Sequence, residues 1–235
     1  MFRFIQSGVT IQQPITIALQ SYRKYGWQRY VSGLKHRAEF NEIEDLVVFS
    51  SKVSHRATLW KQRNVGQGPY LAVHFRAGRM LDRINKINNA TFLVEWAKLC
   101  IRNISATIAL IQASSLANVG VPIFLATDLR HDGMRGGEFP ATWAMRGALR
   151  KVRKLVFAEF KNALSLPASD AQALNRYDPM TAASVLDMAI CAKADYFVSM
   201  EDSFSRLVSQ DRRRQGMMSE IFKCIEPPGF EGLLK

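Results

Sequence analysis

Short apolar runs alternate along this chain with segments whose apolar residues recur every three or four positions. The runs are LVVF at 46–49, YLAVHFR at 70–76, VPIFLATD at 121–128 and DYFVSM at 195–200. Between the second and third runs, an apolar stripe from Leu93 to Ile111 has the spacing of a long amphipathic helix. Buried parallel strands are continuous apolar runs, and helices connect them. The alternation therefore predicts an α/β fold, a Rossmann-like parallel sheet with helices on both faces.

The charge distribution divides the chain into two parts. The chain has 235 residues and a formal net charge of +12, and its first 38 residues hold six Lys or Arg and no acid. We expect residues 1–45 to form a basic N-terminal extension, and residues 46–235 to form the Rossmann-like domain with an irregular C-terminal tail. The extension has the composition of a mitochondrial targeting segment, and the alternative is a basic arm that lies on a partner.

The basic charge favours an anionic partner. In the segment 147–164, an apolar stripe from Leu149 to Phe160 is surrounded by Lys and Arg, which predicts a helix whose basic side faces solvent or a partner. We expect protein subunits of a larger complex to contact residues 1–45 and this basic helix. RNA is the alternative partner, through the same helix and the arginines at 212–214, although the aromatic–basic interleaving of a known RNA-binding motif is absent from the sequence.

The cysteines and the apolar runs bear on the compartment. Cys100, Cys191 and Cys224 are odd in number and widely spaced, so we expect buried reduced thiols rather than a disulfide framework or a zinc site. No run of about 18 apolar residues is present, and we expect no membrane span. No secretory signal is visible, and the basic N-terminal composition predicts the mitochondrial matrix or another organellar matrix as the compartment.

Polar residues end three of the predicted strands, where ligands of α/β proteins bind. His74 and Arg76 are two residues apart and so point to the same side of their strand. A guanidinium matches the geometry of a phosphate, although an arginine that closes a loop is equally common. Asp128 ends the next strand, where it would hold a ribose, order a loop or cap a helix. The third strand leads into MEDSFSR, where Asp202 or Ser203 would cap the following helix.

Taken together, the segments YLAVHFRAG, PIFLATD and VLDMAICAKADYFVSMEDSFSRLVSQDRR resemble the C-terminal half of the GDP-fucose protein O-fucosyltransferase family. The resemblance covers roughly residues 46–214 and implies the C-terminal Rossmann-like domain of a GT-B glycosyltransferase, with GDP-fucose as substrate and no metal or other cofactor. It implies that Arg76, as the catalytic residue, and His74 meet the diphosphate and the sugar. It also implies that Asp128 and Asp187 belong to the nucleotide-sugar site, Asp187 at the guanine, and that Ser203 and Phe204 contact the phosphates and the base.

The chain departs from the family pattern at charged positions. The acid of the family's HxRxGD motif falls at Arg79 or is missing, and Asp202 replaces a small hydroxyl residue near the phosphate. A carboxylate beside a diphosphate weakens binding unless it is paired or protonated. The sequence therefore predicts that Arg76 pairs with the acids Asp128 and Asp202 rather than with a nucleotide.

Three functions follow as hypotheses. The first is a degenerate, non-catalytic fucosyltransferase-like protein that serves as a structural or accessory subunit of a larger assembly. The second is an active, inverting GDP-fucose-dependent O-fucosyltransferase, in which Arg76 stabilises the leaving diphosphate. The third is an RNA-associated subunit of a ribonucleoprotein.

Overall fold

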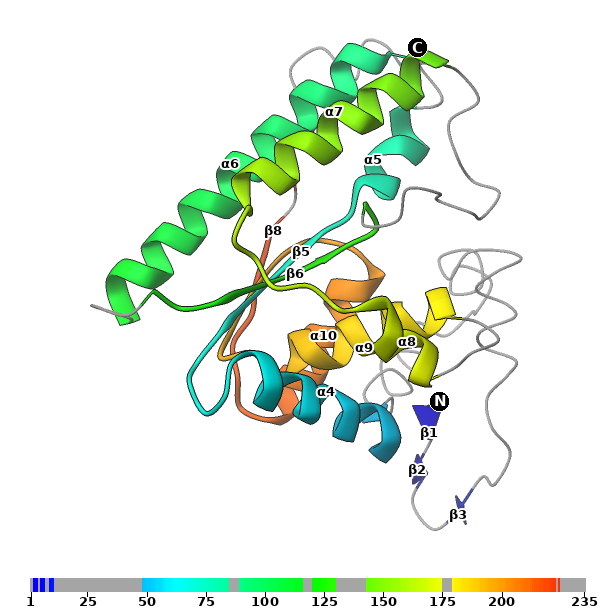
Figure 1. Cartoon of the computed structure of the whole chain (residues 1–235), viewed down its shortest axis with the longest axis vertical. Coiled ribbons are helices and arrows are strands. Elements are labelled where there is room, and N and C mark those ends of the chain that lie inside the picture. The colour runs from blue at the N-terminus through cyan, green and yellow to red at the C-terminus, as the bar shows by residue number, and fades with distance from the viewer. Residues whose placement is uncertain are drawn as a thin grey trace. The chain divides into compact units, whose positions relative to one another are not determined.

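The computed structural model describes residues 2–3, 5–6, 9–10, 48–84, 89–115, 120–129, 143–174, 179–222 and 224 (Figure 1). The chain forms two compact units, each built from separate stretches of sequence. The first comprises Met1–Gln67, Leu166–Lys193 and Arg206–Met218, and the second comprises Gly68–Ser165, Ala194–Ser205 and Ser219–Lys235.

The second unit holds a parallel sheet of four strands. Its strands are β5 (Leu71–Phe75), β6 (Ile123–Thr127), β7 (Tyr196–Met200) and β8 (Glu220–Phe222), in the spatial order β6-β5-β7-β8. Every neighbouring pair runs parallel. The predicted α/β fold with a parallel sheet is thus confirmed, and three of its strands lie where the apolar runs predicted them.

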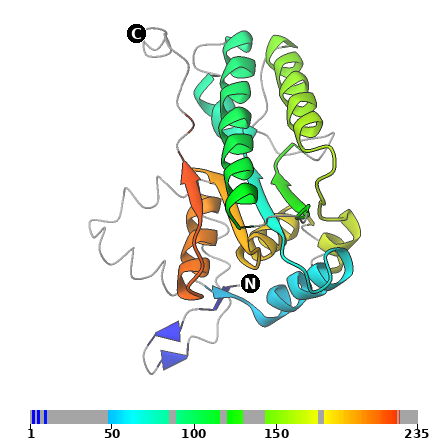
Figure 2. The ribbon, with the colours of Figure 1, turned by 90° about the vertical axis from the view of Figure 1, so that its left-hand side faces the viewer.

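One face of this sheet packs against two helices. Alternate β5 residues, from Leu71 to Phe75, join a core with apolar residues of α6 (Ala90–Ser115) and α7 (Trp143–Glu159). The two helices lie side by side in Figures 1 and 2. All five β5 residues are buried, as expected for a strand that is covered on both faces.

A short helix, α5 (Ala77–Ile84), starts directly after β5 and was not predicted. No capping side chain precedes it in the sequence. Its first N–H groups find an acceptor about 50 positions further along the chain, as described below. The N-terminal end of α5 therefore lies at the carboxyl edge of the sheet.

The first unit is mainly helical. It contains α4 (Ser51–Asn64), α8 (Ala168–Leu174), α9 (Pro179–Ala192) and the larger part of α10 (Ser203–Arg214). Helix α4 packs against α9, and α8 packs against both. The Ser50 hydroxyl caps α4 by accepting a hydrogen bond from the Val53 N–H, and Pro179, whose ring suits the first turn of a helix, is the first residue of α9.

Short strands lie near the start of the chain. Strand β4 (Val48–Phe49) pairs antiparallel with β1 (Phe2–Arg3), and β2 (Ile5–Gln6) pairs with β3 (Val9–Thr10). Most of the predicted basic extension at 1–45 lies outside the described residues. Among the helices that are described, none combines the length and the apolar character that a membrane crossing requires.

The expectation that all three cysteines are reduced thiols is wrong for two of them. Cys100 of α6 and Cys224 form a disulfide, with their Cα atoms 5.3 Å apart. The Cys224 carbonyl oxygen also accepts a hydrogen bond from Trp96 Nε1, so Cys224, two positions after the end of β8, is held to α6 twice. The pair is separated by 124 positions, which leaves no local sequence pattern to reveal it. Cys191 is a buried free thiol, as predicted.

Candidate functional site

The order of the strands places a candidate site at the carboxyl edge of β5 and β7. Strand β6 lies on one side of β5, while β7, the next strand along the chain, lies on its other side. Ligands of open α/β sheets bind where the strand order reverses in this way, beyond the carboxyl ends of the strands. His74 of β5 lies in register with Ser199 of β7, so the polar end of each strand meets the other at this point.

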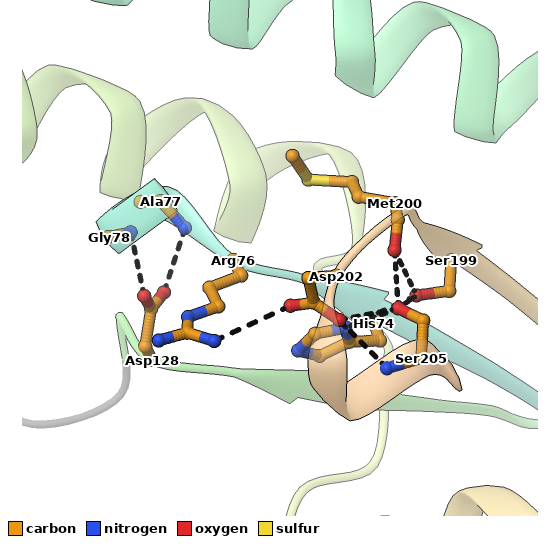
Figure 3. Close-up of polar contacts among 9 residues, drawn as sticks. All are labelled: His74, Arg76, Ala77, Gly78, Asp128, Ser199, Met200, Asp202 and Ser205. Atoms are coloured by element: carbon orange, nitrogen blue, oxygen red, sulfur yellow. Dashed lines mark hydrogen bonds and ion pairs between the residues drawn. The ribbon is translucent and has the colours of Figure 1, made fainter. Parts of the chain in front are cut away.

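His74 is the buried centre of the cluster (Figure 3). Its imidazole ring stacks on the Phe204 ring, with the centroids 3.9 Å apart and the planes inclined by 11°. Its Nδ1 atom lies 3.1 Å from the Ser199 Oγ atom and 3.4 Å from the Ser205 Oγ atom. The two hydroxyls are themselves 2.5 Å apart, and the Met200 carbonyl oxygen lies within hydrogen-bonding distance of both as a further acceptor. The ring is therefore fixed by stacking and by hydrogen bonds.

Asp202 caps helix α10. Its Oδ1 atom accepts hydrogen bonds from the Ser205 N–H and from the Ser205 hydroxyl, both at 2.7 Å. This is the bond from the third helical residue to the capping side chain that defines an N-cap, so the predicted capping role is confirmed for Asp202. The carboxylate occupies the positive end of the helix dipole, which otherwise attracts anions.

The same carboxylate lies beside the Arg76 guanidinium and the His74 imidazole. The Asp202 Oδ2 atom lies 3.7 Å from Arg76 Nη1, and the Oδ1 atom lies 3.8 Å from His74 Nδ1. Burial by itself would raise the pKa of Asp202. The charge of a protonated His74, the two hydrogen bonds from Ser205 and the neighbouring guanidinium outweigh it and hold this pKa below its usual range. Asp202 is therefore an ionised, partnered acid at neutral pH.

Arg76 lies between two acids. Figure 3 shows its guanidinium group directed between the side chains of Asp128 and Asp202. The Arg76 side chain is 33% exposed, whereas that of Asp202 is 4% exposed, so the guanidinium is the more accessible group of this pair. The predicted pairing of Arg76 with Asp202 is confirmed, and the Arg76 charge also acts to lower the pKa of Asp128.

Asp128 caps helix α5 from the neighbouring strand end. Its carboxylate oxygens accept hydrogen bonds from the Ala77 N–H at 2.9 Å and the Gly78 N–H at 2.7 Å. Three roles were predicted for Asp128, and the structure shows one of them, helix capping. Desolvation by burial raises the pKa of Asp128, and the two hydrogen bonds offset only part of the rise. A Cβ atom at Gly78 would lie 2.9 Å from Asp128 Oδ2, so the close approach of this carboxylate requires glycine.

The charges of the cluster largely satisfy one another. One guanidinium faces two carboxylates, and each carboxylate occupies the N-terminus of a helix. A bound diphosphate would bring further negative charge to the same place, and like charges at short range oppose binding. The arrangement is suited to hold β5, β6 and β7 together at their ends. Within the described parts of the chain, no three His, Cys, Asp or Glu side chains form a group that fits a metal ion.

The other predicted site residues either lie outside this cluster or have side chains outside the described part of the chain. Asp187 is a buried residue of α9 and belongs to the first unit, whereas His74, Arg76, Asp128 and Phe204 belong to the second. Ser203 begins α10, but its side chain lies outside the described residues. The side chain of Arg79, in α5, also lies outside them. The nucleotide-binding roles that the resemblance implies for these residues stay predictions.

The sequence interpretation missed Ser199 and Ser205. Ser205 follows Asp202 by three positions, which is the spacing of a capping residue and its N–H partner, and this signal could have placed it in the cluster. Ser199 carried no such signal. Its contact with His74 depends on β7 pairing with β5 in that register, which the sequence does not reveal.

Comparisons with known proteins give a distant likeness in structure alone. No protein-family model matches this chain, and no curated protein matches its sequence. A crystal structure of POFUT1 in complex with GDP has a TM-score of 0.43 and 15% identity, and the match covers 79% of this chain and 50% of that one. A structure of POFUT1 in complex with GDP-fucose has a TM-score of 0.40 and 16% identity, with the same coverage. The chain thus spans about half the length of the proteins that it matches.

Proposed function

We propose that this chain is a non-catalytic Rossmann-like domain that serves as an accessory subunit of a larger assembly. In this proposal the carboxyl edge of its sheet is a structural cluster rather than a nucleotide-sugar site. The observation that carries the proposal is the position of the buried Asp202, which caps α10 and pairs with the partly exposed Arg76.

The proposal follows from the competition between Asp202 and a ligand phosphate. A diphosphate would need the Arg76 guanidinium and the free end of a helix dipole as its main attractions. The Asp202 carboxylate already interacts with both of these groups. It lies 3.7 Å from the Arg76 guanidinium, and it caps the N-terminus of α10. Displacing it would leave a buried charge without its partners, which is costly.

Calorimetry of the full chain with GDP, GDP-fucose and guanosine tests this proposal. We expect no saturable heat with GDP or GDP-fucose at concentrations up to about 1 mM, corresponding to a binding free energy weaker than about −4 kcal/mol. Guanosine separates recognition of the base from recognition of the phosphates. A micromolar dissociation constant for GDP-fucose would overturn the proposal and favour the alternative, an active GDP-fucose-dependent transferase.

The accessory role is tested separately, by the assembly that the chain joins. We propose residues 1–45 as the segment that contacts protein subunits, because the first 38 residues carry six basic residues and no acid. Deletion of residues 1–38 removes the two-residue pairing of β1 with β4 and the two-residue pairing of β2 with β3, and it leaves the helices of the first unit in place. We expect unchanged circular dichroism and loss of the large native assembly on gel filtration. An unchanged assembly would contradict the role of this segment.

The compartment is also a proposal. A mitochondrial or other organellar location agrees with the basic N-terminal composition. The Cys100–Cys224 disulfide is typical of an oxidising environment. Within such an organelle it therefore favours an oxidising compartment over a reducing one. Thiol labelling of the native protein under non-reducing conditions distinguishes an oxidised pair from two free thiols.

A further inference from the structure

The exposed side of α7 has an unusual composition. Helix α7 buries Met145, Ala148, Val152 and Val156. Its exposed side carries Trp143, Arg146, Arg150, Lys151 and Lys154. We call these five residues the α7 basic face. Between Trp143 and Ala158 the helix contains five basic residues and no acid, whereas an ordinary solvated surface mixes both signs.

The basic face does not serve the stability of its own helix. Arg146 lies in the first turn, where the helix dipole disfavours a cation. Arg150 follows Arg146 by four positions, and Lys154 follows Arg150 by four, and like charges at this spacing destabilise a helix. The only acid of the helix, Glu159, lies at its end and accepts a hydrogen bond from the Ser105 hydroxyl. An anionic partner would compensate the repulsion that this arrangement creates.

An exposed aromatic ring accompanies the charge. Trp143 is 78% exposed, and the Arg146 guanidinium carbon lies 5.9 Å from the centroid of its ring. The Arg153 guanidinium carbon lies 5.7 Å from the Phe157 ring in the same helix. Proteins that bind single-stranded nucleic acids combine basic side chains for the backbone with aromatic rings and arginine planes for the bases.

We propose that the α7 basic face binds single-stranded RNA. Arg146, Arg150, Lys151 and Lys154 contact phosphates, and the exposed Trp143 ring stacks on an unpaired base. Unpaired bases that are free to stack on a protein side chain are mainly found in RNA loops and ends. An acidic protein or an anionic membrane would engage the same charges but would give the Trp143 ring no base to stack on. The proposal goes beyond the proposed function and does not depend on whether the strand-end cluster binds GDP.

Fluorescence anisotropy with a labelled single-stranded RNA of mixed sequence tests the proposal on the full chain. Each phosphate contact contributes about −0.7 to the slope of log affinity against log salt. The triple variant Arg150→Gln/Lys151→Gln/Lys154→Gln should therefore reduce the magnitude of the slope by about 2. The control variant Lys52→Gln/Arg56→Gln/Arg206→Gln removes the same charge from α4 and α10, at positions outside both basic segments, and should leave the slope unchanged.

The stacking contact has its own signature. Trp143→Ala should weaken RNA binding by about tenfold without changing the salt slope, since stacking on a base is independent of counterions. Trp143→Phe should retain most of the affinity. An equal effect of the two triple variants would overturn the proposal, as would full affinity of Trp143→Ala. Binding of phosphatidylserine vesicles through the same three basic residues, without binding of RNA, would overturn it in favour of a membrane surface.

Discussion

Asp202→Asn separates the two roles of the residue at the centre of the strand-end cluster. Asparagine caps a helix about as well as aspartate does, so the bond to the Ser205 N–H can persist. The substitution removes the negative charge that lies 3.7 Å from the Arg76 guanidinium. The variant therefore tests whether this charge, rather than the shape of the sheet edge, prevents a diphosphate from binding.

The expected gain follows from Coulomb's law. A phosphate on the accessible side of Arg76 would lie roughly 6 Å from the Asp202 carboxylate, which at an effective dielectric constant of 20 costs about 3 kcal/mol per unit charge. That energy corresponds to about 100-fold in affinity. Since the Arg76 side chain is 33% exposed, solvent screening reduces the effect, and we expect a gain of roughly 10- to 100-fold.

Titration calorimetry with GDP measures this gain. Glu95→Gln provides the matched control, because Glu95 is an exposed residue of α6 in the same unit and its loss changes the net charge equally. We expect measurable GDP binding by Asp202→Asn and none by the wild type or by Glu95→Gln. Equal binding of GDP by Asp202→Asn and Glu95→Gln would refute this role of the Asp202 charge.

The same variant has a defined pH dependence. The pKa of Asp202 is lowered in the folded chain, so its ionised form stabilises the fold fully above the ordinary carboxyl pKa of about 4. This contribution is lost as the pH falls through the lowered pKa. Urea titrations should therefore show a difference between wild type and Asp202→Asn that shrinks as the pH is lowered below about 4. A difference that stays constant down to pH 2 would contradict the assignment.

Two further predictions concern stability. Gly78→Ala should destabilise the fold by roughly 1–2 kcal/mol in urea titrations, because its Cβ atom would displace the Asp128 carboxylate from the α5 N-terminus. Gly147→Ala, where a Cβ atom meets nothing within 4 Å, should instead stabilise the fold by about 0.5–1 kcal/mol, and equal effects would refute the argument. Reduction of the Cys100–Cys224 disulfide should lower the free energy of unfolding by up to about 5 kcal/mol, given the large loop that it closes. The stability of the double variant Cys100→Ala/Cys224→Ala should not change with reductant. A wild type whose stability does not change with reductant, or a double variant that reductant still destabilises, would contradict the disulfide.

Elements with a long, regular pattern could be predicted from the sequence. The apolar stripe from Leu93 to Ile111 predicted α6, and the apolar runs predicted β5, β6 and β7. These patterns report burial of one face or of a whole strand, and burial is what fixes such elements. The basic helix predicted at 147–164 exists, but α7 begins at Trp143, where no capping signal marks the start.

Elements that depend on distant partners could not be predicted. Helix α5 is capped by Asp128, which follows it by 50 positions, so its start leaves no trace in its own sequence. Strand β8 has three residues and exists through its pairing with β7. The Cys100–Cys224 disulfide depends on β8 bringing the chain back to α6. In each case the determining contact joins segments that only the folded sheet brings together.

The candidate site shows the same division within a single cluster. The polar strand ends were visible in the sequence, and so was the capping potential of Asp202 beside Ser205. The sequence also predicted that Arg76 faces acids rather than a ligand, but it did not reveal the strand order that sets β7 next to β5 and so brings Asp202 to Arg76. Since β7 lies next to β5, Asp202, which follows β7 and caps α10, lies beside Arg76, which follows β5. A residue that looks like an ordinary helix cap thereby also pairs with the Arg76 guanidinium, and in the proposed function its charge is what opposes the binding of a nucleotide diphosphate.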